Sequence, residues 1–201
     1  TVADMVPLVD ENRILVTAGL RELGVRRRPG LRALLDVADL PPGAPLDASA
    51  VAFRLGPRLN AAGRLGAAQL ALDLLLAAEA DEAAARAREL DDRNKERQRI
   101  QETVVTQAET QAEAQADASA IVVGAEGWHP GVVGIVAARL VDRYRRPAIV
   151  VGFMDGVGRG SARSYAGVNL YEALCGCREH LVAFGGHAAA AGMTVAIEAF
   201  D

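Results

Sequence analysis

Aromatic residues are scarce in this sequence and make up 4% of its 201 positions. The hydrophobic cores must therefore be built mainly from alanine, leucine and valine. Otherwise the composition, with 51% hydrophobic and 24% charged residues, is that of a soluble globular protein. A chain of this length can form one or two domains, each with a core of its own.

Cysteine is also rare, and the two cysteines, Cys175 and Cys177, are two positions apart. On a helix such side chains point to different sides, so we expect no internal disulfide and favour a reducing compartment. A zinc site built from these cysteines with His180 and His187 is disfavoured, because the spacing C-x-C-x2-H-x6-H matches no common zinc motif.

Long apolar runs and a recognisable signal peptide are absent, so we expect a cytoplasmic protein that does not act at a membrane. The sequence starts at Thr1 without a methionine, and we expect it to be part of a longer chain.

Net positive charge is lacking: the formal net charge is −4, which argues against bulk attraction to nucleic acid. The charge is uneven, however, because six arginines between Arg139 and Arg163 face only two acids, Asp142 and Asp155. A local basic face on an acidic protein can still bind a polyanion.

A long helix is predicted over residues 81–116, which contain neither glycine nor proline and have few apolar positions. A helix that is polar on most faces usually connects domains through solvent, so we place the domain boundary here. Before it, helices are predicted at 9–23 (with Ile14, Leu15 and Ala18 on one face and Gly24 as its stop), 30–38 and 66–78.

After the long helix, the pattern predicts a small α/β domain of strand, helix, strand, strand, helix and strand. The strands are expected at 120–123, at 147–153, in the glycine-rich segment that follows, and within 184–195. The helices are expected at 130–144, where Pro130 suits the first turn, and at 170–181.

The stretch Gly158-Arg159-Gly160-Ser161-Ala162-Arg163-Ser164 is the strongest candidate for a binding site. Its glycines leave backbone amides open to a ligand, its two hydroxyls can donate or accept, and Arg163 can bind an anion with a planar fork. Arg159 adds a second positive charge. A glycine-rich turn whose arginines face water explains the same residues equally well. A second stretch, Gly185-Gly186-His187, favours the anion site if the fold brings it alongside.

Three further places carry polar residues in unusual settings. Arg58, Asn60 and Arg64 stand among small residues in a segment broken by Pro57 and Gly63, which predicts a polar site wall rather than a helix interior. A loop with paired arginines is the alternative. His129 precedes the glycine-rich start of a helix, where it can bind an anion or cap the helix. Asp4 follows a short apolar run, a place that suits a metal ligand as well as a cap or turn.

Four blocks recur together in one known group of proteins. They are Thr-Val-Ala-Asp-Met-Val-Pro-Leu (1–8), Pro-Arg-Leu-Asn-Ala-Ala-Gly-Arg (57–64), Gly-Trp-His-Pro-Gly-Val-Val-Gly-Ile-Val-Ala (127–137), and Gly-Ser-Ala-Arg-Ser (160–164) paired with Gly-Gly-His-x-x-Ala-Ala-Gly (185–192). In this order and spacing they resemble the DHH/DHHA1 phosphoesterase superfamily, specifically its RecJ-type single-strand-specific exonucleases. The run 90–98 is similar to the interdomain helix of that family, so the resemblance covers essentially the whole chain.

The resemblance implies an α/β fold: the C-terminal part of a DHH domain (1–78), a long connecting helix (79–117) and a small mixed α/β DHHA1 domain (118–201). The acidic motifs that begin a DHH domain, its Asp-His-His triplet and the later oligonucleotide-binding domain are absent from the 201 residues. Of the metal ligands of the family only Asp4 would remain, so the fragment alone is expected to be inactive.

The implied activity of the parent is 5′→3′ hydrolysis of single-stranded DNA in repair and recombination. Mn²⁺ or Mg²⁺ would lower the pKa of the attacking water and offset charge on the phosphate. Single-stranded DNA with a 5′ phosphate is the implied partner, a single-strand-binding protein or a helicase is a further candidate, and we expect a monomer. The resemblance implies that Asp4 is a metal ligand and a catalytic residue, and that the catalytic His187 donates to the scissile phosphate. The 5′ phosphate would be bound by Ser161, Arg163, Gly185 and Gly186. The DNA backbone would be contacted by Arg58, Asn60 and Arg64, with His129 as a further candidate.

Two rival functions stay open. The first is a DHH/DHHA1 phosphodiesterase for short RNA or cyclic dinucleotides, against which blocks 57–64 and 127–137 argue. The second is a nucleic-acid-binding module without catalysis, because one aspartate cannot assemble a metal centre. A structural fragment with no site is the least favoured reading.

Overall fold

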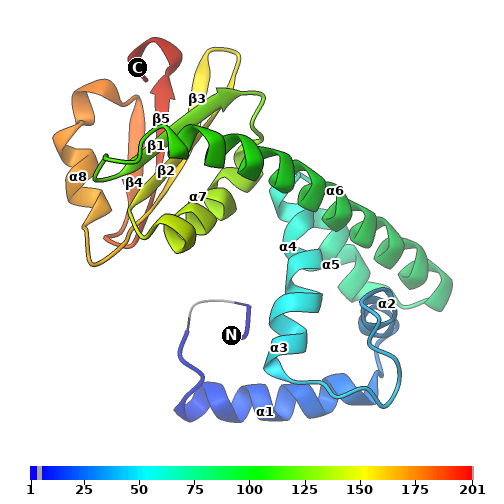
Figure 1. Ribbon diagram of the computed structural model, residues 1–201. Helices are drawn as coiled ribbons and strands as arrows, with labels where there is room; N and C mark the ends of the chain where they lie inside the picture. Colours follow the sequence, from blue (N-terminus) through cyan, green and yellow to red (C-terminus); the bar gives the residue numbers. More distant parts are fainter. Residues whose placement is uncertain (4–5, 201) are drawn as a thin grey trace. The chain divides into compact units, whose positions relative to one another are not determined.

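A computed structural model of the chain describes residues 1–3 and 6–200. The chain forms two compact units, Thr1–Arg97 and Gln98–Asp201. The division falls inside the long helix α6 (Ala80–Glu113), which therefore contributes to both units (Figure 1). The prediction of a long uninterrupted helix is confirmed.

The described residues of the first unit contain only helices: α1 (Asp10–Val25), α2 (Pro29–Val37), α3 (Ala48–Ala50), the π-helical turn η1 (Val51–Leu55), α4 (Gly56–Arg64), α5 (Ala68–Leu76) and the first part of α6. Its core contains the fully buried side chains of Leu34, Leu35, Leu74 and Leu90. Helices α2 and α5 touch at Gly30, where a Cβ would lie 1.8 Å from the carbonyl oxygen of Leu74.

The block around Pro57 is helical, so the prediction of a break there is wrong. The amide of Gly56 donates to the carbonyl of Val51, five residues back, and so forms a π-helical turn. This wider turn places Pro57 in the first turn of α4, where a missing N–H costs nothing. The helix therefore continues through a proline that would normally end it.

Helix α1 departs from the sequence prediction in two respects. It buries none of its side chains, and Ile14 and Leu15 are 69% and 63% exposed. It also runs through Gly24 to Val25, and Arg26 takes the left-handed conformation at φ 55°. The guanidinium of Arg26 donates to Asp36 and to the carbonyl of Leu40, so a tertiary contact sets this helix end.

The second unit contains a five-stranded sheet in the order β1-β2-β3-β5-β4. Strands β1 and β2 are parallel, and the other pairs are antiparallel. The strands are β1 (Ile121–Glu126), β2 (Ala148–Met154), β3 (Val157–Arg163), β4 (Ala183–Gly186) and β5 (Ala190–Ala196). The last predicted strand, 184–195, is therefore a hairpin of two strands.

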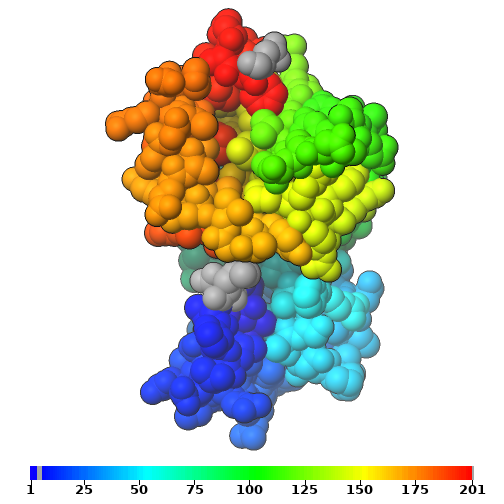
Figure 2. All heavy atoms as spheres, turned by 60° about the vertical axis from the view of Figure 1, so that its left-hand side comes forward, coloured from blue at the N-terminus to red at the C-terminus, as the bar shows by residue number. Residues whose placement is uncertain are grey.

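Helices cover both faces of this sheet. Helix α7 (Pro130–Tyr144) and the second part of α6 pack on one face, against Ile121, Val123 and Val150. Helix α8 (Leu170–Gly176) packs on the other, against Ala162 and Met193. Figure 2 shows α8 in orange and α7 in yellow-green on opposite sides of this unit. Helix α8 is shorter than predicted and is followed by the 3-10 turn η2 (Arg178–His180) and, after β5, by η3 (Ile197–Ala199).

Three arginines of the expected basic face form hydrogen bonds or ion pairs with other residues of the second unit. Arg143 donates to Glu109 on α6 at 2.6 Å, and Arg139 lies 3.5 Å from Glu102. Arg146 donates to carbonyls in the turn that follows α6, including that of Gln115 at 2.7 Å. The positive charge of this segment therefore serves largely to fasten α7 and the loop after it to α6.

Among the described residues, no helix is both long and apolar enough to cross a membrane. Cys175 and Cys177 are exposed free thiols, as expected from their spacing.

Candidate phosphate-binding site

The glycine-rich candidate stretch is the central strand β3, not a turn. Its neighbours β2 and β5 pair with it along its whole length, so its backbone amides belong to the sheet. The expectation that these glycines expose amides to a ligand is therefore wrong. Gly158 and Gly160 serve packing instead: a Cβ on Gly158 would lie 2.6 Å from the Phe153 ring, and one on Gly160 would lie 2.9 Å from Met193.

Strand alternation sends the polar side chains of β3 to the opposite face, the one on which α7 packs. There Arg163 Nη1 donates to Ser161 Oγ and to the carbonyl of Ala162, both at 2.8 Å. Helix α7 approaches this pair at Gly134, whose missing Cβ would lie 3.0 Å from both Ser161 Oγ and Arg163 Nη2. A glycine on α7 thus leaves room for the serine and the guanidinium.

The sheet register places Ser161 and Arg163 in two cross-strand rows, each formed by residues directly opposite one another on neighbouring strands. Ser161 is opposite Gly192, and Gly192 is opposite Gly185. Arg163 is opposite Ala190, whose carbonyl accepts from the backbone amide of His187 at 2.8 Å. The structure therefore brings together two segments that the sequence analysis could only pair conditionally.

These rows form an open, shallow surface. Gly192, Gly185 and His187 are exposed, and no heavy atom other than those of its chain neighbours lies within 4 Å of a Cβ built on Gly185. Because the side chains beyond β3 in these rows are hydrogen atoms, a methyl group and an imidazole, a ligand can approach the sheet closely. None of these residues carries a negative charge.

The backbone amides of the two candidate glycines in β4, Gly185 and Gly186, point in different directions relative to β5. In an antiparallel ladder, residues alternate between donating inward and outward. The inward bond from the His187 amide to Ala190 leaves the amide of Gly186, rather than that of Gly185, directed away from β5. Gly186 has φ +144°, and a Cβ there would lie 2.5 Å from the Ala190 carbonyl oxygen, so this position requires glycine.

His129 caps α7. Its Nδ1 accepts a hydrogen bond from the amide of Gly131 at 3.0 Å. An accepting Nδ1 carries no proton, so the neutral ring has its proton on Nε2. Any ligand contact by His129 is therefore made through Nε2–H.

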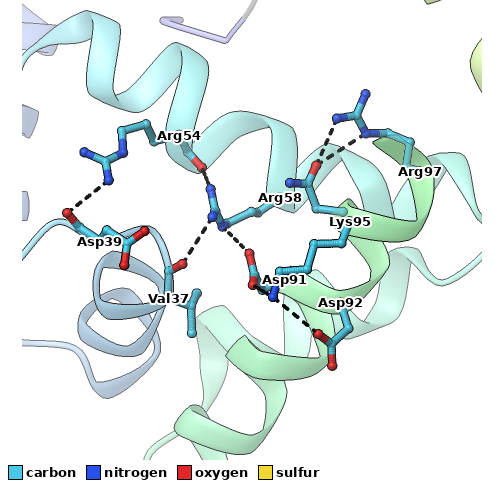
Figure 3. A network of polar contacts seen from close by, with 9 residues as sticks. Val37, Asp39, Arg54, Arg58, Asp91, Asp92, Lys95 and Arg97 are labelled. Carbon is cyan, nitrogen blue, oxygen red and sulfur yellow. Dashed lines mark hydrogen bonds and ion pairs between the residues drawn. The ribbon is translucent and has the colours of Figure 1, made fainter. Parts of the chain in front are cut away.

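Of the candidate residues in the first unit, Arg58 is held by the protein (Figure 3). Its Nε donates to Asp91 at 2.8 Å, Nη1 to the carbonyl of Arg54 at 2.7 Å and Nη2 to that of Val37 at 3.1 Å. Only 17% of its side chain is exposed. Asp91 also contacts Lys95 at 2.7 Å, and this hydrogen bond, followed by the charge of the same carboxylate, raises the pKa of Lys95. Arg58 thus ties α4 to α6 and α2.

Asn60 and Arg64 are exposed on α4. Nearby, Arg97 is buried and donates through Nε and Nη2 to Asn94 Oδ1 at 3.3 and 3.1 Å. Burial, and then the positive charge of Arg64, lowers the pKa of Arg97. The structure thus brings the guanidinium of Arg97 on α6 close to that of Arg64 on α4, a proximity that sequence spacing alone did not reveal.

The described part of the chain contains no group of three or more His, Cys, Asp or Glu residues that could hold a metal ion. The zinc set of Cys175, Cys177, His180 and His187 is not assembled. Asp4, the predicted metal ligand, lies outside the described residues. The described residues therefore do not form a metal centre by themselves.

Comparison with known proteins supports the assignment of the second unit and of the chain as a whole. Residues 117–201 match the family model of the DHHA1 domain. Over 98% of its length the chain is 47% identical to the single-stranded-DNA-specific exonuclease RecJ of Bacillus subtilis, of which it covers 25%. It is 39% identical over its full length to RecJ of Escherichia coli, of which it covers 36%. The crystal structure of Thermus thermophilus RecJ with Mn²⁺ matches all of the chain with a TM-score of 0.90 at 40% identity, over 29% of that structure.

Over its whole length the chain is similar to one part of the RecJ-type single-stranded-DNA-specific exonucleases. The expected mixed α/β fold with a long helix before the sheet is confirmed by the RecJ match. The chain spans between 25% and 37% of the length of the curated RecJ relatives. The matching RecJ crystal structures are complexes with Mn²⁺ or Mg²⁺.

Within the RecJ-like chain, sequence reasoning missed the importance of Gly192, Ala190 and the position of Gly134 over Ser161. Gly192 and Ala190 were present in the quoted Gly-Gly-His-x-x-Ala-Ala-Gly block. Their place beside Ser161 and Arg163 follows from strand register, which no local pattern specifies.

Proposed function

We propose that this chain is the part of a RecJ-type, single-stranded-DNA-specific exonuclease that binds the terminal 5′ phosphate of the strand. The observation that carries the proposal is that Ser161, Arg163 and His187 lie in adjacent cross-strand rows on one face of the sheet, beside Gly134 of α7. We place the phosphate over these two rows.

The donor set suits a phosphate. The hydroxyl of Ser161 accepts from Arg163 and keeps its own proton to donate. Arg163 is held by its local hydrogen bonds, so its guanidinium is ordered before the ligand arrives, which reduces the entropy cost of binding. The amide of Gly186 and the imidazole of His187 supply further donors at the edge of the sheet, and no carboxylate opposes them. Charge-assisted hydrogen bonds of this type are the strong ones.

In the first unit, we propose that Asn60 and Arg64 contact the DNA backbone. Arg58 serves the same surface indirectly, since its donors are engaged by Asp91 and two carbonyls and thereby hold α4 in place. His129 contributes through Nε2–H.

For the whole protein we propose 5′→3′ hydrolysis of single-stranded DNA with Mn²⁺ or Mg²⁺, with Asp4 as one metal ligand and His187 as a catalytic donor to the scissile phosphate. DNA repair and recombination, a cytoplasmic monomer, and cooperation with a single-strand-binding protein or a helicase belong to the same proposal.

The test is binding of a single-stranded oligonucleotide, with and without a 5′ phosphate, to the 201-residue chain, measured by fluorescence anisotropy. We expect the phosphorylated strand to bind more tightly and Arg163→Ala to remove the preference. Arg163→Lys keeps the charge but not the planar fork, so it should restore the preference only in part. Arg178→Ala, which removes an exposed arginine of η2, is the matched control.

Equal binding of both strands would overturn the phosphate assignment. Degradation by the full-length parent then separates the remaining functions. Progressive loss of long strands supports the exonuclease, cleavage confined to short RNA or cyclic dinucleotides supports the first rival, and binding without cleavage supports the second.

A further inference from the structure

Arg159 lies on the same face of β3 as the proposed phosphate site but forms no part of it. It is two residues before Ser161 and four before Arg163, so alternation directs all three side chains to one face. Arg159 is exposed, and within the described part of the chain its side chain makes no hydrogen bond or ion pair. This contrasts with Arg139, which pairs with glutamates of α6.

The row that contains Arg159 is built like the phosphate rows. Arg159 is opposite Gly152 on one side and Thr194 on the other, and Thr194 is opposite Ala183. The side chains beyond Arg159 are thus a hydroxyl and a methyl group, with no acid among them. The surface stays open to a ligand, and a second hydroxyl donor lies beside the arginine.

A loop closes one side of this surface. A Cβ on Gly152 would lie 2.0 Å from the carbonyl oxygen of Trp128, so the segment before α7 passes directly over β2 at this row. The open direction from Ser161 and Arg163 is therefore along β3 and toward the small residues of β5 and β4. Among the described residues of these rows, the direction along β3 leads to another positive charge, that of Arg159.

The spacing along β3 suits a nucleic-acid backbone. Residues two apart on a strand are separated by about 6.7 Å. Adjacent phosphates in an extended single strand are separated by a similar distance, and single-strand-binding proteins follow the backbone with a positively charged groove. The spacing of the donors on Arg163, Ser161 and Arg159 is thus close to the spacing of adjacent phosphates in the strand.

We infer that Arg159 and Thr194 form a second phosphate subsite, which binds the phosphate after the terminal one when the terminal phosphate lies at Ser161 and Arg163. The strand then runs from its 5′ end at Arg163 toward Val157, antiparallel to the direction of β3. This inference rests on the proposed function, since it needs the first phosphate to be bound as described.

Three ligands and three variants of the 201-residue chain test the subsite by isothermal titration calorimetry. The ligands are thymidine 5′-monophosphate, the 5′-phosphorylated dinucleotide pTpT, and pTpT with an uncharged methylphosphonate at its internal linkage. The variants are Arg159→Ala, Arg163→Ala and the control Arg178→Ala.

Arg159→Ala should leave the affinity for the mononucleotide unchanged and weaken pTpT binding about tenfold, the loss of one charge-assisted contact. The methylphosphonate should produce the same loss in the unaltered chain and no further loss in Arg159→Ala. The salt dependence of pTpT binding, as log K against log salt, should become shallower by about 0.7 for one phosphate contact fewer.

Failure of the subsite and failure of the proposed function give different results. If Arg163→Ala weakens both unmodified ligands but Arg159→Ala weakens neither, the phosphate site stands and the subsite is wrong. If Arg163→Ala leaves mononucleotide binding unchanged, the proposed function itself is wrong. Equal weakening of the mononucleotide and pTpT by Arg159→Ala would place Arg159 in the first site and also overturn the subsite.

Discussion

Arg58 and Arg163 are the same residue type in glycine- and alanine-rich surroundings, and they differ in what accepts their hydrogen bonds. Arg58 donates to a carboxylate and to carbonyls on other elements, so its charge is balanced inside the first unit. Arg163 donates to Ser161 Oγ and to the carbonyl of Ala162, both within its own strand. The first arginine therefore stabilises contacts between helices, whereas the second lies at the surface proposed to bind the phosphate.

Replacement of Arg58 should affect stability more than binding. Arg58→Ala leaves the largely buried Asp91 with Lys95 as its remaining ionic partner, so we expect the free energy of unfolding to fall by about 2–3 kcal/mol. Urea denaturation measures this loss. Asn60→Ala, an exposed change on the same helix, should alter stability by less than about 0.5 kcal/mol. Equal stability of the two variants would contradict the structural role of Arg58.

Gly134 permits a direct test of the space around Arg163. In Gly134→Ala, the new methyl group would lie 3.0 Å from Ser161 Oγ and Arg163 Nη2, so the guanidinium must move. We expect binding of the 5′-phosphorylated strand to weaken about tenfold, as for one misplaced charge-assisted hydrogen bond. The melting temperature should not fall, because alanine gains about 1 kcal/mol over glycine in a helix.

Gly19→Ala in α1 is the control for that helix effect, since nothing lies within 4 Å of its Cβ position. It should leave phosphate binding unchanged. Unchanged binding in Gly134→Ala as well would mean that the ligand does not use the observed arrangement of Ser161 and Arg163.

Among the elements, β3 gives the glycine-rich motif its meaning. As a central strand, β3 alternates small residues toward the α8 side with Arg159, Ser161 and Arg163 toward the α7 side. The motif therefore combines two features: its small residues allow the sheet to pack, and its polar residues face the proposed phosphate site.

The close contact between β2 and the segment before α7 should not tolerate even a methyl group at Gly152. In Gly152→Ala, the methyl group would lie 2.0 Å from the Trp128 carbonyl oxygen, so backbone must shift. We expect a loss of about 3 kcal/mol in the free energy of unfolding, as for an overpacked core. Gly176→Ala, where nothing lies within 4 Å, should be nearly neutral; a similar loss there would contradict the cause given for Gly152.

For the whole molecule, the family match and the compact unit do not begin at the same residue. The DHHA1 match begins at residue 117, whereas the second compact unit begins at Gln98. The difference is the end of α6, whose Val104, Val105, Ala108 and Ala112 belong to the core that α7 and the sheet share. The connecting helix is therefore also a structural part of the second unit.

This predicts that residues 98–201 fold alone and residues 117–201 do not. The only tryptophan, Trp128, is 2% exposed and donates to Gln107 on α6 at 2.6 Å. Its fluorescence emission in the 98–201 chain should match that of the 201-residue chain. In the 117–201 chain it should shift to longer wavelength, because the core and Gln107 are missing. Identical emission from both shorter chains would show that α6 is dispensable to the second unit.

The sequence alone determined the kind of most elements and the family. The long helix, the strand at 120–123 and the helix that begins at Pro130 depend on residue propensities and on glycine and proline positions, which act within a turn or two of the chain. The four blocks identified the family because their order and spacing are visible without a structure.

Only the tertiary structure decided which of the candidate residues share a surface. Ser161 is far in sequence from Gly185 and Gly192, and pairing register aligns the three residues. Contacts of Arg58 with three other elements, and the π-helical turn before Pro57, likewise depend on packing rather than on local preference. The sequence thus supplied the donors, while long-range pairing decided which of them share the proposed phosphate site and which hold the protein together.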